Sequence, residues 1–163
     1  EGEKVSYGKP FILPESGIFH PDASKIFSDF DEYLQWYIEK GHYNQKGFWV
    51  GIHTFSSSAS KERGKIENYI IQSLEKEGIN VLPVFGRPPY HESLKKYFLD
   101  EKEKPRVQII CGFAFRFLRG FEEKTKNLLC RINTPIFMPL LAHSITIDQW
   151  QKSEAGISPL RVA

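Results

Sequence analysis

The chain has 163 residues, of which 40% are hydrophobic and 26% are charged, a composition typical of one globular domain and not of a fibre or a disordered segment. The formal net charge is +2 and lysines alternate with glutamates, so there is no basic stripe and we expect no nucleic-acid partner. The apolar runs are too short to span a bilayer and no secretory signal opens the chain, which favours a cytoplasmic protein without a membrane span.

Two cysteines, Cys111 and Cys130, are too few and too far apart for a disulfide framework or a zinc knuckle. We expect both to be buried reduced thiols, which favours a reducing compartment.

The chain begins without a methionine and ends within a patterned segment, so we expect a piece of a larger protein. Residues 1–163 are predicted to form a single α/β domain. In it, residues 1–16 are an extended lead-in, because they are polar and carry glycine and proline.

Residues 24–40 are predicted to form an amphipathic helix that ends at Gly41. Its apolar side chains recur at intervals of three and four residues: Ile26, Phe27, Phe30, Tyr33, Leu34, Tyr37 and Ile38. The phrase His20-Pro21-Asp22 precedes this helix. It is expected to form a turn, because Pro21 lacks an amide donor and disfavours helical backbone at His20.

Strands and helices then alternate along the chain. The predicted strands are residues 48–54, 79–85, 107–112 and 135–141. The predicted helices are about 61–77, 121–132 and about 147–152. A further short helix is predicted between the turn at 86–89 and residue 99. The strands are near-continuous apolar runs, typical of a parallel sheet covered by helices on both faces. Right-handed crossovers therefore favour a three-layer, doubly wound, mostly parallel four-stranded sheet of flavodoxin-like or Rossmann-like type. We expect the strand order 2-1-3-4 and an extra N-terminal helix.

In such a sheet, ligands bind at the carboxyl ends of the strands where the strand order reverses. At that edge the loop of residues 53–60 lies beside the loop of residues 112–120. The first loop carries Ser56, Ser57 and Ser58 ahead of a predicted helix, whose free amides and dipole can hold a phosphate or a carboxylate. Helix capping by the same serines is the alternative. No glycine-rich nucleotide loop occurs, so we expect no ATP site in this chain.

The second loop combines aromatic and basic side chains. Phe113 and Phe115 could stack on a flat hydrophobic ring, while Arg116 and Arg119 pair with its carboxylates. A porphyrin-like ligand offers both features. In the alternative, the aromatic rings fold back over the sheet and the arginines are solvated.

Histidines supply the candidate metal ligands. His53 ends the first predicted strand, His143 follows the fourth, and His20 would join them if the first helix folds over that edge. Capping or hydrogen bonding by single histidines is the alternative, and His42 and His91 are expected in surface loops. No serine can be tied to a catalytic base, so catalysis confined to this chain is not supported.

Short phrases after residue 15 follow one another in a specific order. They are Gly17-Ile-Phe-His-Pro21, Phe48 to Ile52, the segment from Ile66 to Phe85, Tyr97-Phe-Leu-Asp100, Gly112-Phe113 and Gly156-Ile-Ser-Pro159. Their order and spacing resemble the large subunit of the cobaltochelatase and magnesium-chelatase family. The chain departs from the family pattern at loops of the predicted ligand edge, where it reads Thr54-Phe-Ser-Ser-Ser58 and Pro139-Leu-Leu-Ala-His-Ser144.

The resemblance implies a fragment of the very large subunit that holds a tetrapyrrole. AAA+ ATPase partner subunits would use ATP and Mg²⁺ to drive insertion of Co²⁺ or Mg²⁺ into the ring, as in cobalamin or chlorophyll-type biosynthesis. The fragment would then hold no cofactor of its own, supply one wall of the site and depend on other domains of the same subunit. Two alternatives stay open. One is a haem- or tetrapyrrole-binding relative without metal insertion, and the other is a flavodoxin-like module that binds a flavin phosphate at Ser56–Ser58.

Overall fold

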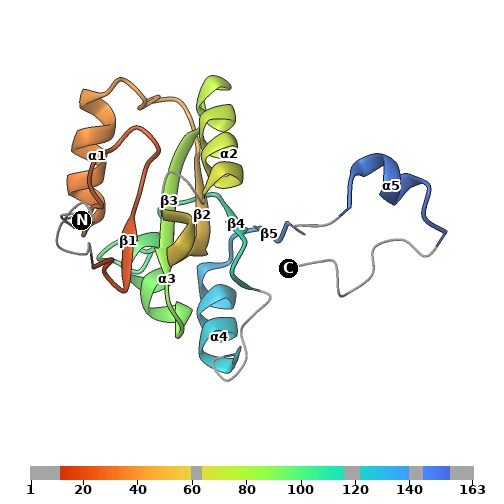
Figure 1. The fold of residues 1–163 in the computed structure, drawn as a ribbon. Helices are drawn as coiled ribbons and strands as arrows, with labels where there is room; N and C mark the ends of the chain where they lie inside the picture. The colour runs from red at the N-terminus through yellow and green to blue at the C-terminus, as the bar shows by residue number, and fades with distance from the viewer. Residues whose placement is uncertain (1–11, 60–63, 116–121, 140–144, 155–163) are drawn as a thin grey trace, which may run out of the picture.

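The computed structural model describes residues 12–59, 64–115, 122–139 and 145–154 as an α/β fold around a five-stranded sheet (Figure 1). The strands are β1 (Ser16–Ile18), β2 (Trp49–Phe55), β3 (Asn80–Gly86), β4 (Ile109–Gly112) and β5 (Ile136–Phe137). The helices are α1 (Phe30–Glu39), the 3₁₀ turn η1 (Ser56–Ala59), α2 (Lys65–Lys76), α3 (Tyr90–Phe98), α4 (Glu122–Ile132) and α5 (Ile147–Gln151).

Four strands of the sheet run parallel in the order β3-β2-β4-β5, which confirms the predicted order 2-1-3-4. Val50 of β2 lies opposite Val81 of β3 on one side and Ile109 of β4 on the other. The predicted number of four strands is wrong, because β1 adds a fifth, antiparallel strand beside β3. The finer assignment to a flavodoxin-like or Rossmann-like fold stays a prediction.

β1 falls at the end of the stretch that the sequence predicted as an extended lead-in. It has only three residues, too few to show an alternating pattern, and Gly17 stands at its centre. A Cβ atom at Gly17 would collide with the side chain of Ile26 and come within 3.0 Å of the Phe85 ring. Glycine therefore lets this short strand pack closely against the segment that follows it.

Helix α1 begins at Phe30, six residues later than predicted. Phe27 instead forms an antiparallel bridge with Ile18, with distances of 2.9 and 3.0 Å between the amide nitrogens and the carbonyl oxygens. The Asp29 carboxylate then accepts from the amide of Glu32 at 2.9 Å and caps the helix. The other described boundaries differ from the prediction by a few residues, and the end of the predicted strand 135–141 lies outside the described residues.

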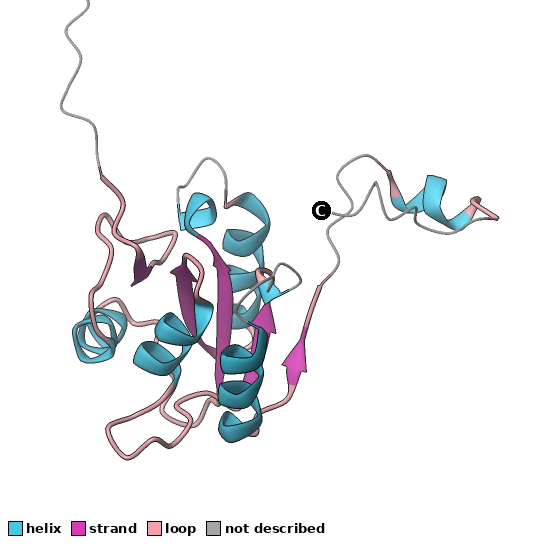
Figure 2. Cartoon of the chain, turned by 90° about the horizontal axis from the view of Figure 1, so that it is seen from below, coloured by secondary structure: helices cyan, strands magenta, loops and turns pink. Residues whose placement is uncertain are grey.

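Helices lie on both faces of the sheet (Figure 2), which confirms the predicted three layers. On one face, α2 places Ile71 against Val50 and Val81. On the other, α3 and α4 pack against the alternate side chains of the same strands; this core includes Leu82, Val84, Leu94, Tyr97, Phe98, Ile110, Leu128 and Ile132. Among the described residues, no helix is both long and apolar enough to cross a membrane.

Helix α1 covers the part of the β3 edge that short β1 leaves unpaired. The buried Tyr33 hydroxyl donates to the Val81 carbonyl at 2.8 Å, and the Val81 amide donates to the Tyr37 hydroxyl at 3.2 Å. These two bonds satisfy backbone groups that a neighbouring strand would otherwise bind. α1 is therefore fixed to the sheet at the side where β1 ends.

Candidate functional site

The predicted ligand edge is occupied by His53 at the end of β2. This side chain is fully buried; its Nε2 lies 2.9 Å from Ser93 Oγ and its ring stacks on Phe115 at 5.2 Å. Ser93 already donates its hydroxyl proton to the Tyr90 carbonyl, so Nε2 is the donor and Nδ1 is left without a partner. Burial lowers the pKa of His53 to about 3. The imidazole is therefore neutral at physiological pH.

The aromatic side chains after β4 fold back over the sheet. Phe113 and Phe115 are each 3% exposed. Gly112 permits this arrangement, because a Cβ atom there would collide with the Phe115 ring. His53 and the two phenylalanines thus fill this part of the edge themselves, where the sequence predicted an open surface. Arg116 and Arg119 lie outside the described residues, and ligand contact by any of these side chains stays a prediction.

The serine loop forms η1, and α2 begins only at Lys65, with Gly64 at its N-cap position. Behind the loop, the Thr54 hydroxyl donates to the buried Glu67 side chain at 2.7 Å. Anion binding by Ser56, Ser57 and Ser58 stays a prediction, and the structure gives it no further support.

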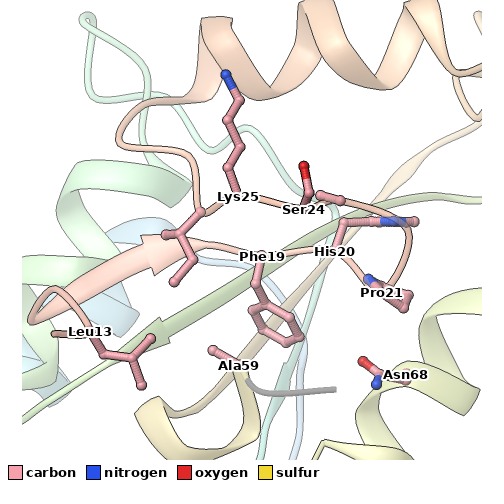
Figure 3. A pocket seen from close by; sticks show the side chains of 10 residues that line it. Leu13, Phe19, His20, Pro21, Ser24, Lys25, Ala59 and Asn68 are labelled. Atoms are coloured by element: carbon pink, nitrogen blue, oxygen red, sulfur yellow. The ribbon is translucent and has the colours of Figure 1, made fainter. Parts of the chain in front are cut away.

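A hollow of about 440 Å³ opens on the β1 side of η1 (Figure 3). It is lined by Leu13, Phe19, His20, Pro21, Ala23, Ser24, Lys25, Ile26, Ala59 and Asn68. Its walls are largely apolar. Lys25 also lines the hollow, and its ammonium group lies 2.6 Å from the Glu32 carboxylate. The hollow takes Ala59 from the loop after β2, and its other lining residues come from the segments around β1 and from α2.

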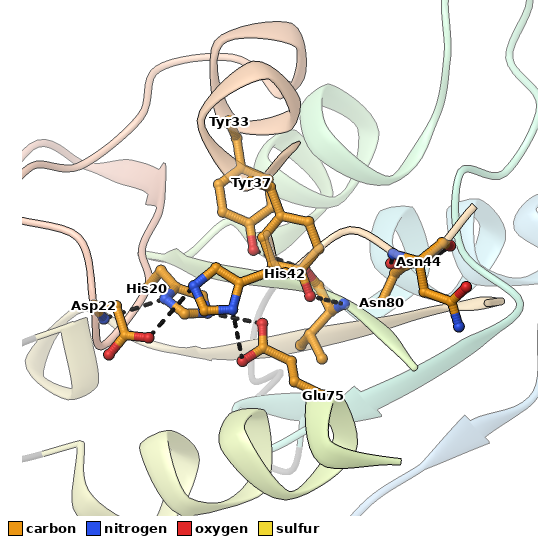
Figure 4. A network of polar contacts seen from close by, with 9 residues as sticks. His20, Asp22, Tyr33, Tyr37, His42, Asn44, Glu75 and Asn80 are labelled. Carbon is orange, nitrogen blue, oxygen red and sulfur yellow. Dashed lines mark hydrogen bonds and ion pairs between the residues drawn. The ribbon is translucent and has the colours of Figure 1, made fainter. Parts of the chain in front are cut away.

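A second constellation gathers His20, His42 and Glu75 from three separate segments (Figure 4). His20 Nε2 lies 2.9 Å from Glu75 Oε1, and His42 Nδ1 lies 3.6 Å from Glu75 Oε2. Asp22 Oδ2 lies 3.4 Å from His42 Nε2. Of the predicted set, His20 and His53 form hydrogen bonds with different partners, and His143 lies outside the described residues, so the set of His20, His53 and His143 stays a prediction.

Local structure explains how each member reaches this cluster. The turn at Pro21 is closed by a 3.0 Å bond from the Ala23 amide to the His20 carbonyl, and the Asp22 amide donates to His20 Nδ1 at 3.2 Å. Glu75 stands near the end of α2. Burial opposes its ionisation, but hydrogen bonds from His20 and Tyr37 and the nearby imidazoles hold the pKa of Glu75 below its ordinary value.

His42 follows α1 directly after Gly41, whose φ of +76° suits glycine. The loop beyond it is fixed by the Asn80 side chain, which accepts from the Asn44 amide and donates to the carbonyls of Asn44 and Gly47, all at 2.8–2.9 Å. The sequence placed His42 in a surface loop. No short spacing links residues 20, 42 and 75, so only the fold reveals the cluster.

The fold and these side chains define an α/β domain with a histidine–carboxylate cluster beside the sheet edge. The chain belongs to the CobN/magnesium chelatase family, whose model matches residues 1–163. It is 26% identical over 175 aligned positions to the chloroplastic magnesium-chelatase protein ChlH of rice, and 26% identical over 162 positions to a magnesium-chelatase subunit of Chlorobaculum parvum. These alignments cover 100% and 92% of this chain but only 13% and 12% of the relatives.

An uncharacterized protein of Methanocaldococcus jannaschii is 24% identical over 161 positions, which are 89% of this chain and 12% of that protein. The chain therefore spans about an eighth of the length of these relatives. The family expected from the sequence phrases is confirmed.

Proposed function

We propose that this chain is a domain of the large, tetrapyrrole-binding subunit of an ATP-dependent metal chelatase. The observation that carries the proposal is the family match over the whole chain, together with relatives named as subunits of magnesium chelatase. Those names favour Mg²⁺ over Co²⁺ as the metal that is inserted. ATP would act on separate AAA+ subunits, as the family resemblance implies.

The physical task of such a protein is to hold a flat macrocycle while a metal ion loses its water and two pyrrole protons leave. This chain supplies one wall. Phe19, Ile26 and Ala59 offer apolar surface in the hollow of Figure 3, and Lys25 can pair with a propionate of the ring. In this proposal, Arg116 and Arg119 hold further carboxylates from the loop after β4.

A reconstitution assay tests the proposal. The full-length protein is mixed with candidate AAA+ subunits, ATP, protoporphyrin IX and either Mg²⁺ or Co²⁺, and formation of the metalloporphyrin is followed by absorbance. We expect product only when ATP and the partner subunits are present, and faster product formation with Mg²⁺.

The other outcomes separate the alternatives. Saturable porphyrin binding without product under any metal condition would contradict insertion and favour a haem- or tetrapyrrole-binding relative. Binding of flavin mononucleotide, with no response to porphyrin, would contradict the tetrapyrrole proposal as a whole.

A further inference from the structure

The cluster of His20, His42 and Glu75 has the donor atoms of a transition-metal site. Two imidazoles and one carboxylate each offer a ligand atom, and these atoms all lie within 4.8 Å of one another. Ions such as Zn²⁺ bind nitrogen and oxygen at about 2.0–2.2 Å, so tetrahedral ligands stand about 3.4 Å apart. The pairs at 2.9 and 3.6 Å already approach that spacing.

We infer that His20, His42 and Glu75 bind a divalent transition-metal ion of the Zn²⁺, Co²⁺ or Ni²⁺ class. This inference goes beyond the proposed function, because it concerns a metal held by the protein itself and requires no tetrapyrrole. Imidazole with carboxylate suits these borderline ions, whereas Mg²⁺ and Ca²⁺ prefer sites made of oxygen alone. The site is therefore expected to discriminate against Mg²⁺.

The surroundings of the cluster hold the ligands in place. His20 is enclosed by Trp36 and Tyr37, whose rings lie 5.0 and 6.0 Å from its own. Tyr37 also forms a hydrogen bond with the Glu75 carboxylate, and Asp22 faces the outer nitrogen of His42. Contacts of this kind orient metal ligands and limit their motion. A simple buried ion pair would need only one of the two imidazoles beside Glu75.

An ion can reach the cluster from outside. A hollow of about 510 Å³ is lined by Gly41, His42, Gln72, Glu75 and Lys76. His20 has no exposed side-chain surface, while the side chains of His42 and Glu75 are 20% and 10% exposed. His42 and Glu75 therefore face this hollow, and the buried His20 lies next to Glu75, with its Nε2 2.9 Å from Glu75 Oε1. Three protein ligands with an open side leave room for a water molecule or another donor.

Metal binding changes one proton position. In the metal-free chain the Asp22 amide donates to His20 Nδ1, so the ring proton sits on Nε2 and points to Glu75. An ion at Nε2 displaces this proton, and the neutral ring then carries its proton on Nδ1. The 3.2 Å contact from Asp22 is lost in exchange. The loss of this contact opposes metal binding and lowers the affinity relative to a site whose ring protons are already placed.

Titration of the metal-free, full-length protein with Co²⁺ tests the inference. The visible d–d absorption of bound Co²⁺ reports imidazole and carboxylate ligation directly, and Zn²⁺ should displace it. His42→Gln and Glu75→Gln should each weaken binding by about tenfold or more. The matched controls His91→Gln and Glu77→Gln change the same residue types outside the cluster and should bind as the unmodified chain does. Mg²⁺ should not displace Co²⁺ from this cluster.

His20 is fully buried, so its substitution is avoided, and thermal unfolding of each variant without metal identifies any that fail to fold. Zn²⁺ should also raise the Tm of the unmodified chain, a readout that needs no variant. Absence of Co²⁺ bands and of a Zn²⁺-dependent rise in Tm at millimolar metal would overturn the inference. Equal affinities for the cluster variants and the controls would overturn it as well.

Discussion

At the scale of single residues, His53 shows how burial changes the role of a side chain. The sequence placed it at a ligand edge, where a histidine is a natural ligand. The structure surrounds it with Tyr90, Phe98 and Phe115 and leaves its Nδ1 without a partner. Periodicity predicts that a residue lies at the end of a strand, but not which side chains from other elements close over it.

His53 makes the stability of the chain depend on pH. Its pKa is about 3 in the folded state and near 6.5 when unfolded, so the unfolded chain binds the extra proton between these values. Stability is then complete above pH 6.5 and falls as the pH drops toward 3. We expect a loss of about 2 kcal/mol between pH 7 and pH 5 from this group, measured by urea unfolding.

The variant His53→Gln should lose most of this dependence, while the control His91→Gln should keep it. Each variant loses one histidine and keeps every carboxylate, so the difference between His53→Gln and His91→Gln isolates the effect of burying His53. An unchanged pH dependence in His53→Gln would contradict the assignment of a buried, neutral imidazole.

Among the elements, α1 stabilises the sheet through the hydroxyl groups of two buried tyrosines, Tyr33 and Tyr37. Burial raises the pKa of both Tyr33 and Tyr37. The nearby Glu75 carboxylate raises the pKa of Tyr37 further, so both phenols stay protonated. Their hydroxyls then remain bonded to the backbone of Val81. The helical spacing of these residues predicted a buried apolar face, but it does not show that the face covers the edge of a strand.

Tyr33→Phe should destabilise the chain by about 1–3 kcal/mol, because it leaves the buried Val81 carbonyl without a donor. Tyr69→Phe is the matched control: this α2 side chain is 73% exposed, and its loss of a hydroxyl should change the free energy of unfolding by about 0.5 kcal/mol or less. Urea unfolding at neutral pH gives both values. Equal effects for the two variants would show that the Tyr33 bond does not stabilise the edge.

Most of the architecture follows from the sequence, for identifiable reasons. Strands such as β2 and β3 are long apolar runs bounded by turn residues, so both their positions and their parallel order could be predicted. β1 and the start of α1 could not, because β1 has only three residues and its bridge partner Phe27 lies in a stretch whose spacing predicts a helix. Pairing between separate segments overrode the local preference.

In the described part of the whole molecule, the segment around His20 and Pro21 contributes both to an apolar hollow and to the histidine–carboxylate cluster. The turn around His20 and Pro21 contributes to the apolar hollow of Figure 3, while the His20 ring faces the cluster of Figure 4. The sequence predicted one ligand edge between two loops. It did not predict that the hollow would open beside β1, since β1 itself was missed.

Equilibrium titration of the full-length protein with protoporphyrin IX shows whether this chain contributes to a tetrapyrrole site. We predict a saturable Soret shift whose affinity falls by about a hundredfold or more in the double variant Arg116→Ala/Arg119→Ala, since each lost charged pair contributes roughly 1.5–3 kcal/mol. Arg131→Ala, which removes an exposed arginine from α4, should leave the affinity unchanged. A protein that gives no saturable shift, or in which all three forms bind alike, would contradict the account.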